Sequence, residues 1–398
     1  MDDAVPTGLL VDLLARLRAA REAASADPFG DPVLLVALDI SRALDEGRIT
    51  TEALARLIPR MAREAARDRA ARLAAYAGMG DDLAALARVA ARLVRPDPED
   101  SPVPYAAFRE AVERTRFAAV FTAHPTFSMP LATGTALAEA AGGAALPEEL
   151  SHRPAPVTLE EEFAQAGAAI ARGRDALDAL SAALFEAACV VWGERALQLR
   201  PRPVILTTWV GYDTDGRTDI GWNDTLRLRL RMKRLQVARL ADRLELLGAC
   251  AAPIVARARE AEAAVAEQEA AAPGKPDAES TRAFALTMID RREAALTTPD
   301  TLLALFPAAI EAAPDAATRL ALAVQRAGLA AHGLALAHTH VRLNSTQVHN
   351  ALRQRLGIAA APEDRAARRG LLTQVDAALA EVEPVPLDFG ALLSEQAS

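Results

Sequence analysis

Three short apolar runs interrupt an otherwise helical sequence, and they limit the folds open to this chain more than any other feature. The runs lie near residues 117–124, 204–210 and 334–342, and each leads into a cluster of polar residues. Long stretches of helical periodicity separate them, and such long connections are typical of parallel strands. The pattern predicts a mostly α protein in which many long helices surround a partial parallel (α/β) barrel made by about three short strands.

The remaining sequence shows apolar residues at the three- and four-residue spacing of helices. Long helices are expected over 158–199, 224–248, 252–271, 278–297 and 315–334. The segment 95–102 contains three prolines, which remove amide donors and disfavour helix before them. We therefore expect a helical region over 1–95 and a helical shell that carries the strands over 104–398.

Charge and cysteine content exclude several classes of protein. Lys and Arg number 45 against 53 Asp and Glu, a net charge of −8, and Lys233 and Lys275 are the only lysines. This balance argues against a nucleic-acid partner bound through a broad basic surface. Cys189 and Cys250 stand far apart in apolar helical contexts, which indicates buried thiols instead of a disulfide framework. With no signal peptide and no spanning segment expected, the predicted location is cytoplasmic.

The polar residues that end the first run include His124, followed by Pro125. A proline holds the residue before it in extended backbone, so His124 is expected at a strand end. Its pKa near neutrality suits a general base or a hydrogen-bond donor to a developing anion. A structural histidine bonded to a backbone carbonyl is an equal alternative.

The second run leads into an acidic turn that contains Asp213, Asp215 and Gly216. Alternating aspartates before a glycine resemble a calcium loop, but Gly211 and Trp222 then occupy the first and last positions, where carboxylates are required. An active-site loop that pairs with arginines or approaches a ligand is the preferred interpretation. A solvated turn before a helix capped by Asn223 or Asp224 is the alternative.

The third run places His338, His340 and Arg342 at alternate positions. Two such histidines can bind zinc, with His349 nearby, but no third ligand is set by spacing. Arg342 is the more informative residue because a guanidinium grips phosphate or carboxylate through two parallel hydrogen bonds. An ion pair with Asp213 or Asp215 is the competing role.

In their order and separation, the three motifs TAHPT, WVGYDTDGR and HVRLNST resemble those of phosphoenolpyruvate carboxylase. The family's motifs read roughly TAHPTE, SWMGGDRDGNP and LDIRQES. The resemblance implies an (α/β) barrel wrapped in helices. It also implies a reaction that condenses phosphoenolpyruvate with bicarbonate, using magnesium, to give oxaloacetate and phosphate.

The resemblance also implies roles for individual residues. His124 matches the catalytic histidine, thought to help carboxyphosphate decompose to carbon dioxide, and Arg342 matches an arginine implicated in binding the substrate phosphate. Asp213, Asp215 and Gly216 match the acidic, glycine-rich loop near the active site. The sequence departs from the family at several places: Phe127 replaces a polar residue, Met129-Pro130-Leu131 replaces an arginine pair, and Tyr212 and Thr214 replace a glycine and an arginine of the acidic loop.

Family members are about twice as long, and the resemblance covers only their amino-terminal half. The magnesium ligands, a catalytic lysine and a glycine- and arginine-rich loop are expected outside this chain. The sequence therefore predicts the amino-terminal half of a carboxylase, inactive alone, completed by the missing carboxyl-terminal half of the barrel and homo-oligomeric when complete. A non-catalytic binding or regulatory relative that keeps the helical shell is the alternative.

Overall fold

The computed structural model describes residues 7–24, 30–78, 82–97, 99–122, 129–148, 150–151, 156–212 and 220–340, with side chains from residue 11 onward. Contacts divide the chain into two compact units, Met1–His340 and Val341–Ser398. In the second unit the described positions are helical: Ala366, Arg369, Gly370, Thr373, Gln374 and Ala377.

Helices form in each of the expected ranges, but two of them end earlier than predicted. The α-helix expected over 158–199 gives way to a 3₁₀-helix at Gly193, and the one expected over 278–297 is interrupted at Arg291. The long helices are α8 (Leu159–Trp192), α9 (Trp222–Glu245), α10 (Ala252–Ala271), α11 (Ala278–Asp290) and α15 (Ala316–His332). Thr158 begins α8 with a capping box, in which its side chain and that of Glu161 satisfy each other's free amides. The helix expected over 278–297 is divided at Arg291 into α11 and the short α12 (Arg292–Ala295). Two short helices that the sequence does not signal follow before α15: α13 (Asp300–Leu303) and α14 (Phe306–Glu311).

The amino-terminal part is also helical, as predicted. Its helices are α1 (Thr7–Ala24), α2 (Pro32–Asp45), α3 (Thr51–Ala77), α4 (Asp82–Val94), α5 (Tyr105–Glu113) and α7 (Leu131–Ala141). Asp31 and Thr50 begin α2 and α3 by accepting hydrogen bonds from free amides of the first turn. Helices α4 and α5 flank the expected boundary at 95–104, which stays a prediction.

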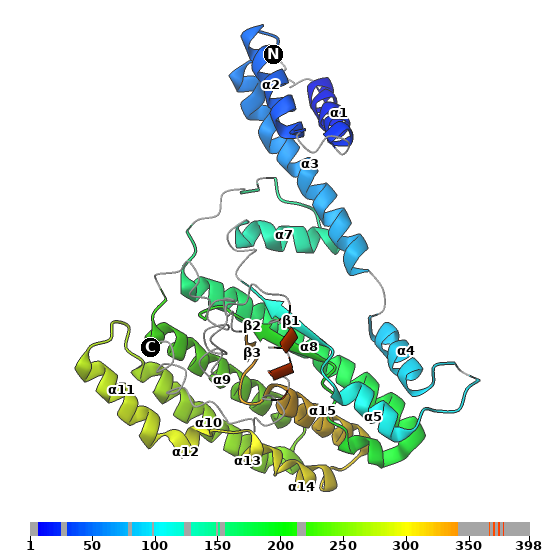
Figure 1. Cartoon of the computed structure of the whole chain (residues 1–398), viewed down its shortest axis with the longest axis vertical. Helices are drawn as coiled ribbons and strands as arrows, with labels where there is room; N and C mark the ends of the chain where they lie inside the picture. The colour runs from blue at the N-terminus through cyan, green and yellow to red at the C-terminus, as the bar shows by residue number, and fades with distance from the viewer. Residues whose placement is uncertain are drawn as a thin grey trace. The chain divides into compact units, whose positions relative to one another are not determined.

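The strands form a parallel sheet in the order β1-β2-β3, which confirms the predicted mostly α chain with a small parallel sheet (Figure 1). Strand β1 (Phe117–Phe121) pairs along its whole length with β2 (Val204–Thr208), and β3 (His338–Thr339) pairs with Thr207 and Thr208. Within the described residues the sheet is open, and the edge strand β1 leaves Phe117 62% exposed.

The third strand is shorter than the predicted run. Helix α15 ends at Gly333, whose φ of +59° suits a residue without Cβ, and Ala335–Ala337 pass buried beneath the sheet before pairing begins at His338. The Leu336 amide donates to the Met232 carbonyl of α9 at 3.2 Å instead of to a strand. Tertiary hydrogen bonds thus replace ladder bonds over the first part of the run.

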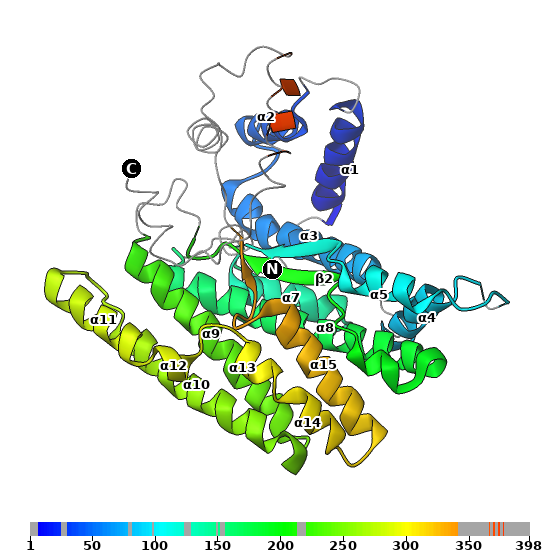
Figure 2. The same ribbon diagram turned by 60° about the horizontal axis from the view of Figure 1, so that its bottom comes forward.

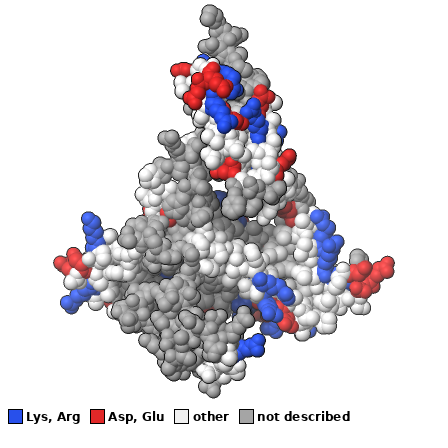
Figure 3. All heavy atoms as spheres, turned by 45° about the horizontal axis from the view of Figure 1, so that its top comes forward, with Lys and Arg blue, Asp and Glu red and all other residues white. Residues whose placement is uncertain are grey.

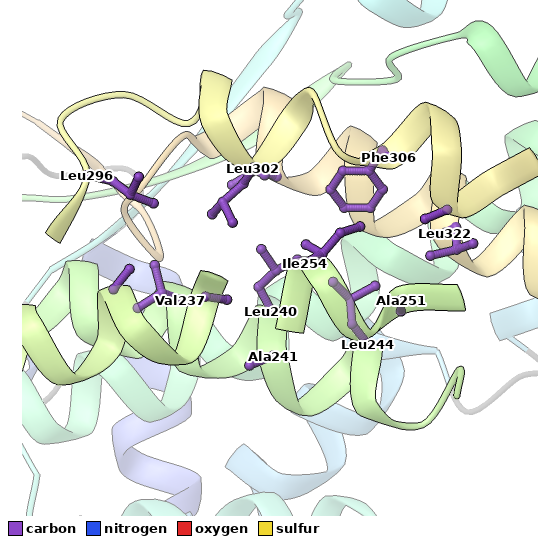
Figure 4. Packing of buried hydrophobic residues seen from close by; sticks show 14 of the residues in the cluster. Val237, Leu240, Ala241, Leu244, Ala251, Ile254, Leu296, Leu302, Phe306 and Leu322 are labelled. Carbon is purple, nitrogen blue, oxygen red and sulfur yellow. The ribbon is translucent and has the colours of Figure 1, made fainter. Parts of the chain in front are cut away.

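Two layers of buried side chains hold the helices to the sheet and to one another. Beneath the sheet, Ile170 of α8 and Met232 of α9 pack against Leu206 of β2. A Cβ on Gly173 would lie 2.9 Å from a Leu206 methyl, so this glycine permits the close approach of α8 to β2. Helices α9, α10, α13, α14 and α15 enclose a second core, shown in Figure 4, centred on Leu244, Ile254, Leu302 and Phe306. Helices α9 and α10 lie side by side, and α15 contacts both α14 and α8 (Figure 2).

The surface charge, a long apolar helix and the two cysteines can each be compared with what the sequence predicts. On the face in Figure 3, Lys and Arg of the described residues lie beside Asp and Glu instead of forming one broad basic surface. By length and composition, the described helical segment Leu159–Gln198 is apolar enough to cross a membrane, whereas the sequence predicts no spanning segment. Core helices of soluble proteins pass the same test. Cys189 and Cys250 are free thiols and are half-buried instead of fully buried.

Candidate functional site

The predicted site residues lie just beyond the described ends of the strands. His124, the acidic-turn residues Asp213, Asp215 and Gly216, and Arg342 all fall outside the described residues. What the structure describes is the edge from which these segments depart: Phe121 and Thr122 after β1, Thr208 to Tyr212 at the end of β2, and Thr339 and His340 at β3.

Thr208 joins the three strands at this edge. Its hydroxyl donates to the Phe121 carbonyl of β1 at 2.9 Å, and its own carbonyl accepts from the His340 amide at 2.8 Å. The side chain is 2% exposed, so both bonds are shielded from water. The three chain segments that lead to the predicted motifs are therefore tied together at one buried residue.

The backbone turns sharply after β2. Gly211 adopts a φ of +86°, a Cβ there would lie 2.5 Å from a Leu228 methyl, and its carbonyl accepts from the Thr225 hydroxyl at 2.7 Å. The turn is closed by the Tyr212 amide, which donates to the Trp209 carbonyl at 2.8 Å. Glycine is required here both by the left-handed backbone and by the close approach of α9.

Aromatic side chains line the described edge. The Trp209 and His340 rings meet edge to face with centroids 5.7 Å apart, which brings the ends of β2 and β3 together. The His338 ring instead bonds the Ala331 carbonyl at 2.8 Å and lies against His332. The two histidines considered as zinc ligands thus take different partners, and the described residues contain no group of three or more side chains that could hold a metal ion.

Helix α9 begins beside this edge, close to where the sequence predicts. Gly221 is the N-cap, and its amide donates to the Asp224 carboxylate at 3.1 Å, so Asp224 caps the helix from within its first turn. Asn223 is buried and donates to the Pro273 carbonyl at 2.9 Å. Of the two predicted caps, Asp224 serves the helix and Asn223 holds the loop after α10.

A buried polar network beneath the strands was missed by sequence reasoning. Arg174 of α8 is 3% exposed and donates to Gln236 at 3.0 Å, to the Leu336 carbonyl at 2.9 Å and to the Gly328 carbonyl at 3.3 Å. Burial lowers the pKa of Arg174 to about 10 despite the nearby charge of Asp178. The signal was present, because Arg174 follows Ile170 by four residues on the helix's apolar stripe.

His332 at the end of α15 completes this network. Its Nε2 accepts from the Leu206 amide at 3.1 Å, at a position of β2 that β3 is too short to reach. Burial, with the charge of Arg174 and the neighbouring His338, lowers the pKa of His332 to about 2. The imidazole is therefore neutral at physiological pH and acts as a fixed acceptor for the middle strand.

The predicted motif segments therefore follow strand ends that are joined by the hydrogen bonds of Thr208. The buried hydrogen-bond network of Arg174 and His332 lies beneath these strands. No protein-family model matches the chain, and a search of curated proteins finds no match.

Proposed function

We propose that this chain is the amino-terminal half of a phosphoenolpyruvate carboxylase, which condenses phosphoenolpyruvate and bicarbonate to oxaloacetate and phosphate in carbon fixation and supplies the tricarboxylic acid cycle. One observation carries the proposal: the three motif-bearing runs are consecutive neighbours in a single parallel sheet, in sequence order. The carboxyl ends of parallel strands meet at one edge, which is where α/β barrels carry their chemistry.

The open sheet also supports the need for a second half. Among the described residues, β1 and β3 each pair only with β2, so each has one unpaired edge. Val120 of β1 is 38% exposed, so apolar surface stands uncovered at this edge. Such edges are costly unless other strands or helices cover them. Further strands from the missing half of the barrel would cover them here.

In this proposal the chain's own residues bind and orient the substrate and move protons. His124 assists proton transfer or stabilises the departing charge, and Arg342 grips the substrate phosphate with two parallel hydrogen bonds. Asp213, Asp215 and Gly216 form a loop that approaches the ligand or pairs with its arginines. Magnesium would be held by carboxylates outside this chain and would neutralise charge on the substrate phosphate when bound.

A non-catalytic binding or regulatory relative is the second candidate, and one observation favours it. Where the family has an arginine pair, Met129 packs against Ala66, Ala70 and Leu137 of α3 and α7. Pro130 is the N-cap of α7, and Leu131 is 61% exposed. Two cationic positions of the family are thus occupied by a core side chain and a helix start.

The test combines binding with turnover. The purified chain, titrated calorimetrically with phosphoenolpyruvate, is expected to bind it more tightly than pyruvate, and to form no oxaloacetate with bicarbonate and magnesium in a coupled malate dehydrogenase assay. The same chain mixed with a carboxyl-terminal barrel half is expected to turn over, and a His124→Asn chain is the matched control. Binding without turnover in the mixture would favour the regulatory relative. A chain that binds no phosphoenolpyruvate would refute both candidates.

A further inference from the structure

Helix α9 carries a series of cations, and most of them are neutralised by neighbouring helices. Arg227 bonds Glu160 at 3.0 Å, Arg234 bonds Glu269 at 2.7 Å, and Arg239 bonds Asp178 at 2.7 Å. Further pairs of the same kind are Arg231 with Glu160 and Glu269, and Arg243 with Asp175. This part of the structure therefore provides a carboxylate for each of these arginines.

Arg229 and Lys233 are different. They stand four residues apart, so their side chains are neighbours on one face of α9, and like charges at this spacing repel. Neither forms an ion pair with any carboxylate that the structure describes. Both are partly buried, where an unneutralised charge is costlier than at the surface.

The hydroxyl of Tyr212, a residue that follows β2, lies beside Arg229 and Thr339. This hydroxyl is buried without a well-formed hydrogen bond. Burial raises the pKa of Tyr212, so the phenol stays protonated and keeps a proton to donate. A buried donor without an acceptor is uncommon, because leaving it unpaired costs free energy.

Lys233 extends the cluster by one helical turn. Its ammonium donates to the carbonyl of Leu296, which has a φ of +63°, a backbone conformation that leucine rarely adopts. Among the described residues the ammonium has this single hydrogen-bond acceptor, which leaves its other N–H donors for another partner. Burial and the charge of Arg229 lower the pKa of Lys233 to about 8. An anion bound here would offset both effects.

We propose that Arg229 and Lys233, with the Tyr212 and Thr339 hydroxyls, form a site for the phosphate group of a small phosphorylated acid beside the carboxyl ends of β2 and β3. Two positive charges match a phosphate dianion, and the N–H and O–H donors of these side chains match its oxygens. The substrate class of this site rests on the proposed function. Besides Arg342, Arg229 and Lys233 are then cations of this chain that hold the substrate.

The experiment uses the full chain with inorganic phosphate and phosphoenolpyruvate as probes in isothermal titration calorimetry. Potassium acetate at matched ionic strength controls for non-specific anion effects. Arg229→Gln and Lys233→Gln are each expected to weaken phosphate binding about tenfold, and together to abolish it. Arg243→Gln, on the same helix but paired with Asp175 at 2.5 Å, is the matched control and should bind like the wild type.

Two further measurements guard against variants that fail to fold. Tyr212→Phe removes one hydroxyl and is expected to weaken phosphate binding several-fold while the helical circular dichroism is unchanged. Between pH 7.5 and 9.5, where the phosphate group of phosphoenolpyruvate stays a dianion, wild-type affinity for phosphoenolpyruvate should fall as Lys233 loses its proton, since its pKa is about 8. The Lys233→Gln chain should lack that fall.

The outcomes separate this site from the proposed function. If phosphate and phosphoenolpyruvate bind equally and both need Arg229, the site stands and the carboxylase assignment fails. If phosphoenolpyruvate binding needs Arg342 but not Arg229 or Lys233, the assignment stands and the site is wrong. Absence of phosphate binding by the folded wild-type chain, or equal binding by the double variant, would show that the two cations serve the acidic turn of this chain and not a ligand.

Discussion

Replacing His332 by glutamine tests whether a neutral, buried imidazole holds the middle strand. The wild-type imidazole accepts from the Leu206 amide, and its pKa is lowered to about 2 from an ordinary 6.5. Below pH 6.5 the imidazole of His332 is therefore protonated in the unfolded chain but stays neutral in the native state. This contribution to stability is fully present above pH 6.5 and is lost as the pH falls from there toward 2.

The magnitude follows from the width of that window. Each pH unit within it costs about 1.4 kcal/mol, so His332 removes about 2 kcal/mol from the free energy of unfolding between pH 7 and pH 5. Glutamine can still accept from the Leu206 amide through its side-chain oxygen, but it does not titrate. His332→Gln is expected to be about 1 kcal/mol less stable than wild type at pH 7, and to lose about 2 kcal/mol less on acidification.

Urea unfolding followed by circular dichroism at 222 nm, at pH 5, 6 and 7, measures both quantities. Thr208→Val is the matched control, because it breaks a buried hydrogen bond of the same strand, from the Thr208 hydroxyl to the Phe121 carbonyl, without removing a titrating group. It should be destabilised at every pH and keep the wild-type acid slope. An acid slope of His332→Gln equal to that of wild type would refute the reasoning.

Three other substitutions follow from the site and the turn. His124→Asn, assayed in a protein that contains the remaining barrel strands, should lower turnover by roughly 10²–10⁴-fold without loss of folding, and unchanged turnover would mean a structural histidine. Arg342→Lys keeps the charge but loses the two-pronged geometry, so substrate affinity should fall by about 1–3 kcal/mol, seen as a raised KM for phosphoenolpyruvate with little change in bicarbonate dependence. An unfolded variant whose folded fraction binds normally would instead make Arg342 a structural ion-pair residue. Gly211→Ala should lower the free energy of unfolding by about 1–3 kcal/mol in urea titrations, from the left-handed backbone and the Leu228 methyl together. Gly248→Ala, with a φ of +79° but open space around its Cβ position, should cost less, and equal losses would contradict the packing argument.

Local chemistry explains how much of the fold could be predicted from the sequence. Helices α8, α9, α10, α11 and α15 follow from apolar spacing, and they begin within a few positions of the predicted starts. Helices α8 and α11 end several residues before the predicted ends. Parallel pairing of the three short runs follows from the long helical connections between them. Each of these features depends on residue spacing, helix breaks and connection lengths, which the sequence contains directly.

The tertiary structure alone decided which polar groups meet in the interior. The third run became a strand only at His338 and Thr339, because the Met232 carbonyl and Arg174 take the hydrogen bonds of Leu336. Arg229 and Lys233 look like their neighbours in the sequence of α9, yet the packing of α8 and α10 supplies carboxylates to the other arginines and turns these two toward Tyr212 and Leu296. Such pairings join residues far apart in the chain, so the free energy that selects them comes from burial and desolvation in the assembled core, which no local pattern contains.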